Sequence, residues 1–230
     1  MPTIEQARRW YPDDDHTHGF SHILRVLALA EDIARQEGAD WRVVRAAVLL
    51  HDAQEGEAPR KSHHLGAADF ARKVLTAEGW EETDIQAVEH CIRTHRFRDQ
   101  EEAPRSLEAR VLFDADKLDA IGGVGVMRAV AYAVQRGEPL YVSPSDAFLE
   151  TGKKEPGEPH TPYHEYHYKL RHLAGLLHTE AARRLAQNRQ RVMAVFFDGL
   201  LEELPDRLTG DEKKINPGIH RGGEDKGEAG

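Results

Sequence analysis

A histidine and an aspartate stand side by side at the end of a strongly apolar segment. Residues 41–50 read WRVVRAAVLL, and His51 and Asp52 follow directly. Burying a carboxylate without a positive partner costs several kcal/mol, so an inward-facing HisAsp pair needs a cation nearby. An isolated pair of this kind is more simply explained as the polar end of a helix. Its interpretation therefore depends on the rest of the chain.

A second histidine has the helical phase of an interior residue. Within residues 20–37, His22 shares a stripe with Val26, Leu29 and Ile33. Residues at three- and four-residue steps lie on one face of a helix, and this face is apolar. His22 is therefore predicted to face the core, as a hydrogen-bonded core histidine or as a metal ligand.

Three acids interrupt another apolar segment, LEARVLFDADKLDAI at residues 107–121. They are Asp114, Asp116 and Asp119, and Lys117 lies among them. Asp114 and Asp116 each share a face with apolar neighbours, so helical periodicity does not distinguish them. Lys117 compensates only one acid, and a divalent cation would compensate the others.

Two imidazoles and two carboxylates would form a mixed nitrogen and oxygen ligand set. Such a set suits Mn, Fe, Co, Ni or Mg, with water in the open positions, better than it suits a thiolate-rich structural zinc site. The metal would lower the pKa of a bound water, polarise a phosphoryl group and orient it for in-line attack. Glu55 follows Asp52 by one helical turn and is placed to orient or deprotonate that water; alone it would be a solvated loop acid.

The elements that must position these residues are helices. Apolar residues recur with the helical period along most of the chain, and no segment alternates convincingly as a strand, so the predicted fold class is all-α. The predicted helices span approximately residues 20–37, 41–52, 63–78, 83–95, 107–121, 124–136, 163–178 and 179–204.

Three other segments carry their own expectations. Residues 137–162 contain five of the eleven prolines and no helical period, which indicates a functional flap or a surface excursion. The apolar stripe of 179–204 is suited to covering the core or to pairing with a second copy in a homodimer. Residues 210–230 are charged and Gly-rich, and they are predicted to be a disordered tail.

Composition restricts the partners. The 230 residues carry a formal net charge of −9, which opposes nucleic acid as a main partner. Binding of a phosphate substrate must therefore rest on a metal ion and a few local cations. No apolar run approaches the length of a membrane span, the N-terminus is too polar for a signal peptide, and Cys91 is the only cysteine. A cytoplasmic protein without membrane contacts is expected.

The ordered set of His22, HisAsp at 51 and 52, and Asp116 resembles the HD-domain superfamily of metal-dependent phosphohydrolases. The chain is most similar to a bacterial branch with nucleotide pyrophosphohydrolase activity. The similarity covers approximately residues 18–204. The segments that carry it are HGFSHILRV, LLHDAQE, HLGAADFARKVL, EHCIRTHRFR, LEARVLFDADKLDAIGGVGVMR and YHYKLRHLAGLLHTEAARRLAQNR.

The resemblance implies a single HD-domain helical bundle over residues 1–209. Its core would span about 18–136, and additional C-terminal helices would span about 163–204. The implied metal ligands are His22, His51, Asp52 and Asp116. This assignment selects Asp116 over Asp114, which periodicity leaves open.

The resemblance also implies a catalytic role for Glu55 alongside Asp52. Mn²⁺ or Mg²⁺ is the expected ion, and Co²⁺, Ni²⁺ and Fe²⁺ are compatible with the ligands. One metal is favoured. Some members of the superfamily hold a second metal through additional histidines, for which His64 and His90 are the candidates.

The implied substrate is a nucleotide, and the implied activity is that of a (deoxy)nucleoside triphosphate pyrophosphohydrolase or phosphatase using metal-activated water. The alternatives are a 5'-nucleotidase acting on nucleoside monophosphates, a non-catalytic metal- and nucleotide-binding regulator, and a di-iron oxygenase, which would need more histidine ligands. The cations predicted to contact phosphate are Lys117, Arg25, Arg128 and Lys169, with His95 and Arg96 as weaker candidates.

Overall fold

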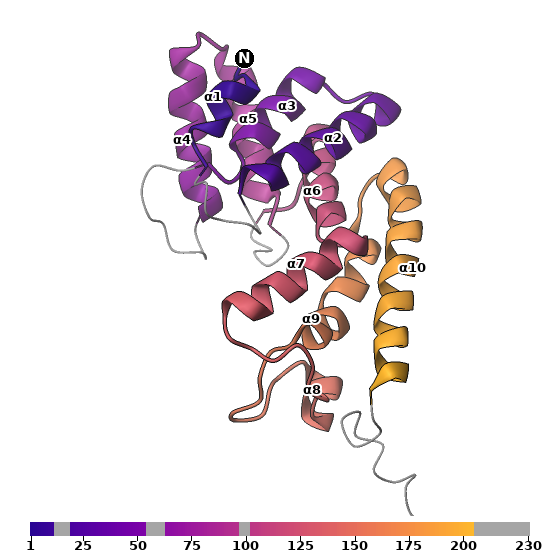
Figure 1. Ribbon diagram of the computed structural model, residues 1–230. Coiled ribbons are helices and arrows are strands. Elements are labelled where there is room, and N and C mark those ends of the chain that lie inside the picture. The colour runs from indigo at the N-terminus through magenta and orange to yellow at the C-terminus, as the bar shows by residue number, and fades with distance from the viewer. Residues whose placement is uncertain (12–18, 54–62, 97–101, 205–230) are drawn as a thin grey trace, which may run out of the picture.

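The computed structural model describes residues 1–11, 19–53, 63–96 and 102–204 (Figure 1). Helices account for the regular structure in these ranges, which contain no strand. The all-α prediction is thus confirmed. Glu55 and the predicted tail at 210–230 lie outside the described residues.

The first six helices form a bundle. They are α1 (Ile4–Arg8), α2 (Phe20–Glu37), α3 (Trp41–Leu50), α4 (His63–Ala77), α5 (Glu82–Thr94) and α6 (Leu107–Asp119). Except for α1, which was not predicted, they follow the expected segments. Helix α2 packs against α3 and α6, and α5 packs against α3, α4 and α6.

Helix α3 lies at the centre of this bundle. Its residues from Val43 to Leu50 are buried apart from Arg45, as the nearly continuous apolar sequence predicts. Asp40 begins the helix by accepting a hydrogen bond from the backbone N–H of Arg42. The helix ends at Leu50, so the buried His51 and the half-buried Asp52 follow directly after its last turn.

The remaining helices form a second layer beside and below the bundle (Figure 1). They are α7 (Gly122–Gln135), α8 (Asp146–Thr151), α9 (Pro162–Tyr168), the 3₁₀-helix η1 (Leu170–Leu176) and α10 (Glu180–Glu203). Helix α8 lies within the segment 137–162 that shows no helical period. Ser145 begins it by accepting a hydrogen bond from the backbone N–H of Phe148.

The prediction of one continuous helix over 163–178 is wrong. The α-helix ends at Tyr168, and the chain continues as η1. Leu170, Leu173 and Leu176 recur every three residues, so a 3₁₀-helix brings them to one face. Leu170 and Leu173 are buried there, and Leu176 packs partly buried against the same core.

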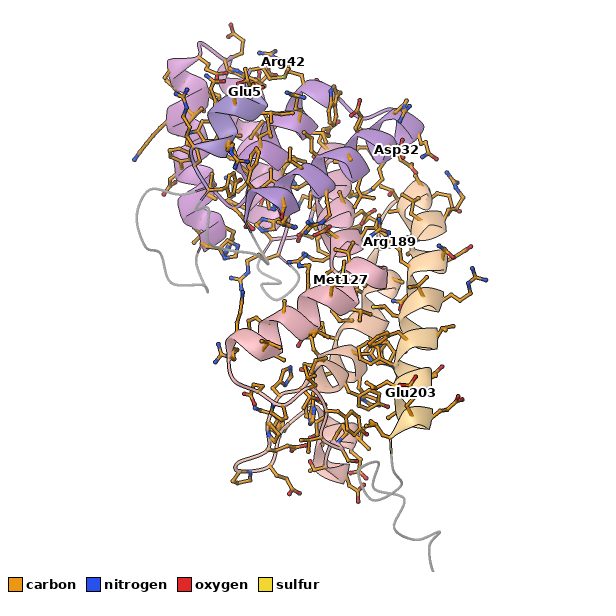
Figure 2. The ribbon with its side chains drawn as sticks, in the orientation of Figure 1. Glu5, Asp32, Arg42, Met127, Arg189 and Glu203 are labelled. Carbon is orange, nitrogen blue, oxygen red and sulfur yellow. The ribbon has the colours of Figure 1, made fainter. Side chains whose placement is uncertain are left out.

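Helix α10 covers the junction between the two layers. Met193 and Phe197 are fully buried, whereas Phe196 is 43% exposed and Val195 is 68% exposed. Arg189 points toward the end of α6 and donates a 2.8 Å hydrogen bond to the carbonyl of Leu118 (Figure 2). The stripe thus covers the core, and pairing with a second copy stays a prediction. Within the described ranges, no helix is both long and apolar enough to cross a membrane.

Candidate metal centre

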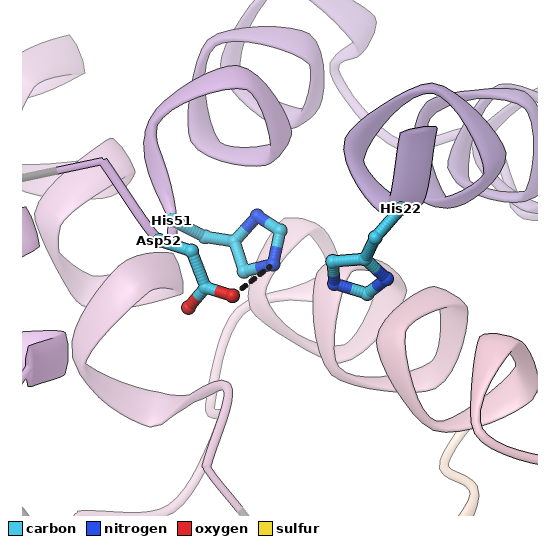
Figure 3. Close-up of side chains that lie close together, drawn as sticks. All are labelled: His22, His51 and Asp52. Carbon is cyan, nitrogen blue, oxygen red and sulfur yellow. Dashed lines mark ion pairs between the residues drawn. The ribbon is translucent and has the colours of Figure 1, made fainter. Parts of the chain in front are cut away.

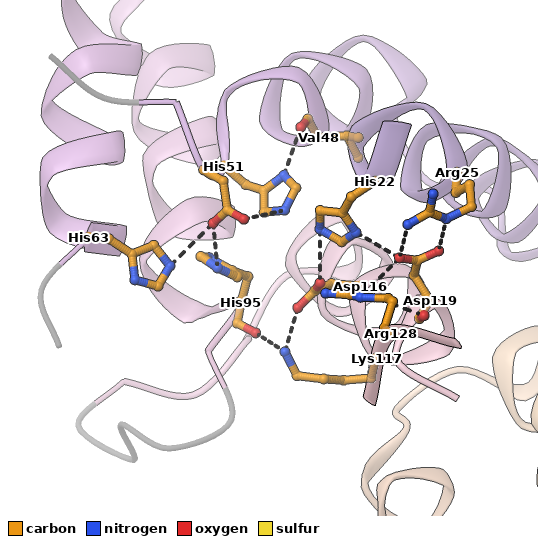
Figure 4. Close-up of polar contacts among 11 residues, drawn as sticks. His22, Arg25, Val48, His51, His63, His95, Asp116, Lys117, Asp119 and Arg128 are labelled. Atoms are coloured by element: carbon orange, nitrogen blue, oxygen red, sulfur yellow. Dashed lines mark hydrogen bonds and ion pairs between the residues drawn. The ribbon is translucent and has the colours of Figure 1, made fainter. Parts of the chain in front are cut away.

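Side chains from four helices meet at one end of the bundle. His22 lies in the first turn of α2, His51 follows α3, His95 follows α5, and Asp116 lies near the end of α6 (Figures 3 and 4). The His22 and His51 ring centroids are 5.5 Å apart, and those of His51 and His95 are 5.1 Å apart. The ends of α3, α5 and α6 that lie here are C-termini, whose partial negative charge favours a cation.

His51 is fixed in the orientation that a metal ligand requires. Its Nδ1 lies 2.8 Å from the carbonyl oxygen of Val48, which can only accept, so Nδ1 carries the proton in the neutral ring. Nε2 therefore presents a lone pair. This buried atom has no hydrogen-bond partner among the described residues, and it lies 3.6 Å from Oδ2 of Asp52.

Asp119 fixes His22 in the same way. Oδ2 of Asp119 accepts a 2.7 Å hydrogen bond from Nδ1 of His22, which leaves Nε2 to face Oδ1 of Asp116 at 3.5 Å (Figure 4). Arg25 and Arg128 also donate to the Asp119 carboxylate. Burial alone would raise the pKa of Asp119, but the hydrogen bonds from His22 and Arg25 hold it well below its ordinary value.

Two further histidines face Asp52. Its Oδ1 lies 3.2 Å from Nε2 of His63 and 3.6 Å from Nε2 of His95. His95 has Nδ1 within 2.6 Å of the Ile92 carbonyl, so its Nε2 is also unprotonated in the neutral ring. Burial and the neighbouring His51 lower the pKa of His95 to about 3, so the ring is neutral at pH 7. Burial alone would raise the pKa of Asp52, but the imidazoles around it, first His51 and then His63, hold it well below its ordinary value when they carry a proton.

These contacts fit a divalent cation. In the neutral rings of His22, His51 and His95, the unprotonated Nε2 atoms face carboxylate oxygens at 3.5–3.6 Å. Two electron-rich atoms at that separation repel each other unless a proton or a metal ion lies between them. One group of potential ligand atoms, from His22, His51 and Asp52, lies within 4.8 Å of one another. A second group, from Asp52, His63 and His95, meets the same distance. Asp52 belongs to both groups.

Asp116 and Asp114 lie on different sides of α6. Asp116 faces His22, and its Oδ2 accepts a 2.6 Å hydrogen bond from Lys117. Burial would raise the pKa of Asp116, but the Lys117 ammonium holds it well below its ordinary value. Asp114 is instead directed toward the start of α10, away from the cluster. There it accepts hydrogen bonds from the backbone N–H groups of His178 and Thr179 and from the Thr179 hydroxyl.

Each of the four cations predicted to bind substrate is paired with a carboxylate of the chain. Arg25 and Arg128 share Asp119, Lys117 contacts Asp116, and Lys169 contacts Glu165. Lys117 also donates to the carbonyl of His95 at 2.8 Å. Lys117, Arg25 and Arg128 thus lie around the cluster, whereas Lys169 lies on the second layer, next to α9. Their contact with substrate stays a prediction.

Sequence reasoning missed two of the histidines beside Asp52 and the role of Asp119. His95 was considered only as a weak phosphate contact, although it follows the buried residues Cys91 and Ile92 by one turn. Asp119 follows the buried Ala115 by the same step. Helical phase marks both residues as inward-facing, but the chain alone does not identify the groups that they meet.

His64 and His90, the two candidates for binding a second metal, have neighbours that differ from those of His63 and His95. His90 lies 2.7 Å from Glu102 and accepts a hydrogen bond from the backbone N–H of Arg105. His64 is buried in α4 with its ring near that of His63. His63, rather than His64, lies beside Asp52.

The chain matches known proteins along most of its length. The model of the HD domain family matches residues 19–121. The protein YpgQ of Bacillus subtilis (strain 168) is 31% identical over 212 residues, which cover 89% of this chain and 95% of YpgQ.

Solved structures share the fold. The crystal structure of YpgQ in complex with ADP superposes with a TM-score of 0.68 at 30% identity, covering 88% of this chain and 98% of that one. The structure of an HD-superfamily hydrolase from Bacillus thuringiensis superposes with a TM-score of 0.64 at 26% identity, covering 87% of this chain and 95% of that one.

Proposed function

Because this chain belongs to the HD superfamily, we propose that it is a metal-dependent phosphohydrolase that acts on nucleotides, most simply on (deoxy)nucleoside triphosphates. The observation that carries the proposal is the cluster of imidazole Nε2 atoms facing carboxylate oxygens at 3.5–3.6 Å. A nucleotide is supported by the presence of ADP in the YpgQ crystal structure.

The proposed ligands are His22, His51, Asp52 and Asp116. A divalent cation bound to them would supply Lewis acidity to a phosphoryl oxygen and lower the pKa of a coordinated water. Mn²⁺ or Mg²⁺ suits the carboxylates, and the imidazoles extend the choice to Co²⁺, Ni²⁺ and Fe²⁺. We also propose Glu55 as the acid that orients or deprotonates the attacking water.

The surrounding residues hold these groups in place. Asp119 keeps the Nδ1 proton of His22 on the side away from the cluster, as the Val48 carbonyl does for His51. A partner of this kind orients a ligating imidazole and increases its basicity. Lys117 compensates one oxygen of Asp116 and so directs the other toward His22.

The proposal is tested by removing bound metal with a chelator and adding back Mn²⁺, Mg²⁺, Co²⁺, Ni²⁺ and Zn²⁺ separately. Mono-, di- and triphosphate nucleotides are then screened by product chromatography, and bound metal is counted by elemental analysis. Pyrophosphate released from triphosphates would identify a pyrophosphohydrolase, and orthophosphate released from monophosphates would identify a 5'-nucleotidase.

Two variants complete the test. Asp52→Ala should lower hydrolysis by roughly 10³-fold, since the chemistry that a metal supplies is worth several kcal/mol. Asp32→Ala is the matched control, because Asp32 is 54% exposed on α2 and pairs with Arg35 on the outside of the bundle (Figure 2). Wild-type protein no more active than Asp52→Ala with every metal would refute the hydrolase, and nucleotide binding without turnover would then indicate a regulator.

A further inference from the structure

The corner between α6 and α7 follows directly after two of the carboxylates of the candidate metal centre. Helix α6 ends at Asp119 and α7 begins at Gly122, so Asp116 and Asp119 both lie in the last turn of α6. The carbonyl groups of a last helical turn lack partners within the helix and need donors from elsewhere. The position of this corner therefore determines where the two carboxylates that face His22 lie.

Arginines from two helices of the second layer supply these donors. Nη1 of Arg189, on α10, donates to the carbonyl of Leu118 at 2.8 Å and lies 3.5 Å from the carbonyl oxygen of Ile121 (Figure 2). Nη1 of Arg128, on α7, lies 2.8 Å from the carboxylate of Asp119 and 3.4 Å from its backbone carbonyl oxygen. A cation at a helix C-terminus also offsets the partial negative charge there. The end of α6 is thus held by guanidinium groups from both α7 and α10.

The guanidinium of Arg189 is half-buried, and its hydrogen bonds within the described ranges go to backbone carbonyls. Burial lowers the pKa of Arg189, and the charge of Asp119 opposes this shift. Arg191 lies two residues later on the same helix and differs, because it is exposed and donates to Asn188 within α10. Arg189 is therefore placed to hold the backbone of another helix.

The backbone of the corner packs closely against the aliphatic stem of Arg189. Gly122 has a φ of +79°, which is the left-handed region that favours glycine. A Cβ added to Gly122 would lie 3.0 Å from Cγ of Arg189. A Cβ added to Gly125 would overlap the carbonyl oxygen of Ala120. Both glycines thus permit a close fit, in which the position of α10 fixes the path of the chain at the corner.

We propose that Arg189 is a positioning residue for the metal centre, which fixes the last turn of α6 and thereby the directions of Asp116 and Asp119. Asp119 in turn orients the ring of His22 through their 2.7 Å hydrogen bond, and Asp116 faces the same ring. This inference rests on the proposed function. It connects helix α10 to a centre whose proposed ligands all belong to the first six helices or directly follow them.

The test removes the guanidinium and keeps the stem. Arg189→Met is expected to fold, and calorimetric titration of the metal-stripped, full-length protein with Mn²⁺ measures its metal affinity. The affinity should fall by about 10-fold, the lower end of the loss seen when a group that orients a metal ligand is changed. Arg189→Lys should bring it back to within about 3-fold of the wild type, because Lys also donates to the last carbonyls of a helix.

Two control variants on α10 separate positioning from stability. Phe197→Leu alters a fully buried ring that stacks on Tyr166 at a centroid distance of 4.2 Å, away from the corner. It should lower the urea midpoint measured with a chelator and leave the Mn²⁺ affinity within about 2-fold of the wild type, because distant sites act independently. Arg191→Met removes the exposed guanidinium that contacts Asn188 and should change neither quantity.

The outcomes distinguish this inference from the proposed function. Wild-type Mn²⁺ affinity in Arg189→Met, or an equal loss of affinity in Phe197→Leu, would overturn the positioning role while metal binding by the wild type still stood. If Arg189→Met does not fold, Arg189→Gln, which keeps an N–H donor on a shorter side chain, is titrated in its place with the same two outcomes. Wild-type protein that binds no divalent ion and hydrolyses no nucleotide would overturn the proposed function itself.

Discussion

Two regions of helix α6 place aspartates in opposite surroundings. Asp114, which is fully buried, faces the start of α10, and its oxygens accept hydrogen bonds from two backbone N–H groups and one hydroxyl. Asp116 lies two residues later and faces Nε2 of His22 with one oxygen, and its other oxygen accepts a hydrogen bond from Lys117. The donors of the protein therefore satisfy Asp114, whereas one oxygen of Asp116 is directed at the imidazole Nε2 of His22.

The comparison shows how a structural acid can be distinguished from a candidate ligand. Both residues interrupt an apolar segment, so burial and helical phase describe them equally. The surrounding groups separate them: hydrogen-bond donors contact both oxygens of Asp114, whereas Asp116 accepts from Lys117 with one oxygen and faces the His22 ring with the other. The pKa directions have a separate cause, because burial raises the pKa of Asp114 whereas the adjacent Lys117 ammonium holds that of Asp116 well below its ordinary value despite burial.

The largest effect expected from this comparison is on activity. Asp116→Ala should lower kcat/KM by roughly 10³-fold and weaken Mn²⁺ binding, because it removes a proposed ligand. Steady-state kinetics and a calorimetric metal titration measure the two effects, with Asp32→Ala as the control. Full activity and metal affinity in Asp116→Ala would remove Asp116 from the ligand set.

The opposite pattern, a loss of stability without a loss of metal affinity, is expected for Asp114. Asp114→Ala should lower the free energy of unfolding by about 3 kcal/mol, since it leaves two backbone N–H groups and a buried hydroxyl without their acceptor. Urea unfolding measures this loss. Metal affinity measured below the unfolding transition should match the wild type, and a large drop in that affinity would show that the two regions are not separate.

The smallest effect concerns acid stability around Asp119. The folded-state pKa of Asp119 is depressed, so its stabilising contribution is present above the unfolded-state value of about 3.9 and is lost as pH falls below it. Each unit of depression is worth about 1.4 kcal/mol. In Asp119→Asn the side chain has no ionisable carboxyl group, so this pH-dependent contribution to stability is absent. Its deficit relative to wild type should therefore be larger at pH 6 than at pH 3.

Urea midpoints measured in the presence of a chelator at both pH values test this expectation. A deficit that is the same at both pH values would mean that the charge of Asp119 does not support the fold. The corresponding variant of the exposed Asp32, Asp32→Asn, should show no such pH dependence.

The sequence by itself determined the helices and the inward direction of the main polar residues. Helical period is a local property, so it predicted α2 to α7 and placed His22 and His51 on buried faces. It was wrong over 163–178, because a three-residue leucine repeat is also compatible with an α-helix until the packing of Leu170 and Leu173 selects the 3₁₀ form.

Tertiary structure alone decided which groups meet. Asp114 reaches Thr179, 65 residues away, and His22 reaches Asp119, 97 residues away. His63 and His95 come to Asp52 from two further helices. A local pattern shows that a side chain points inward, but it carries no information about the residue across the interface. For this reason the difference between Asp114 and Asp116 becomes visible only in the folded chain.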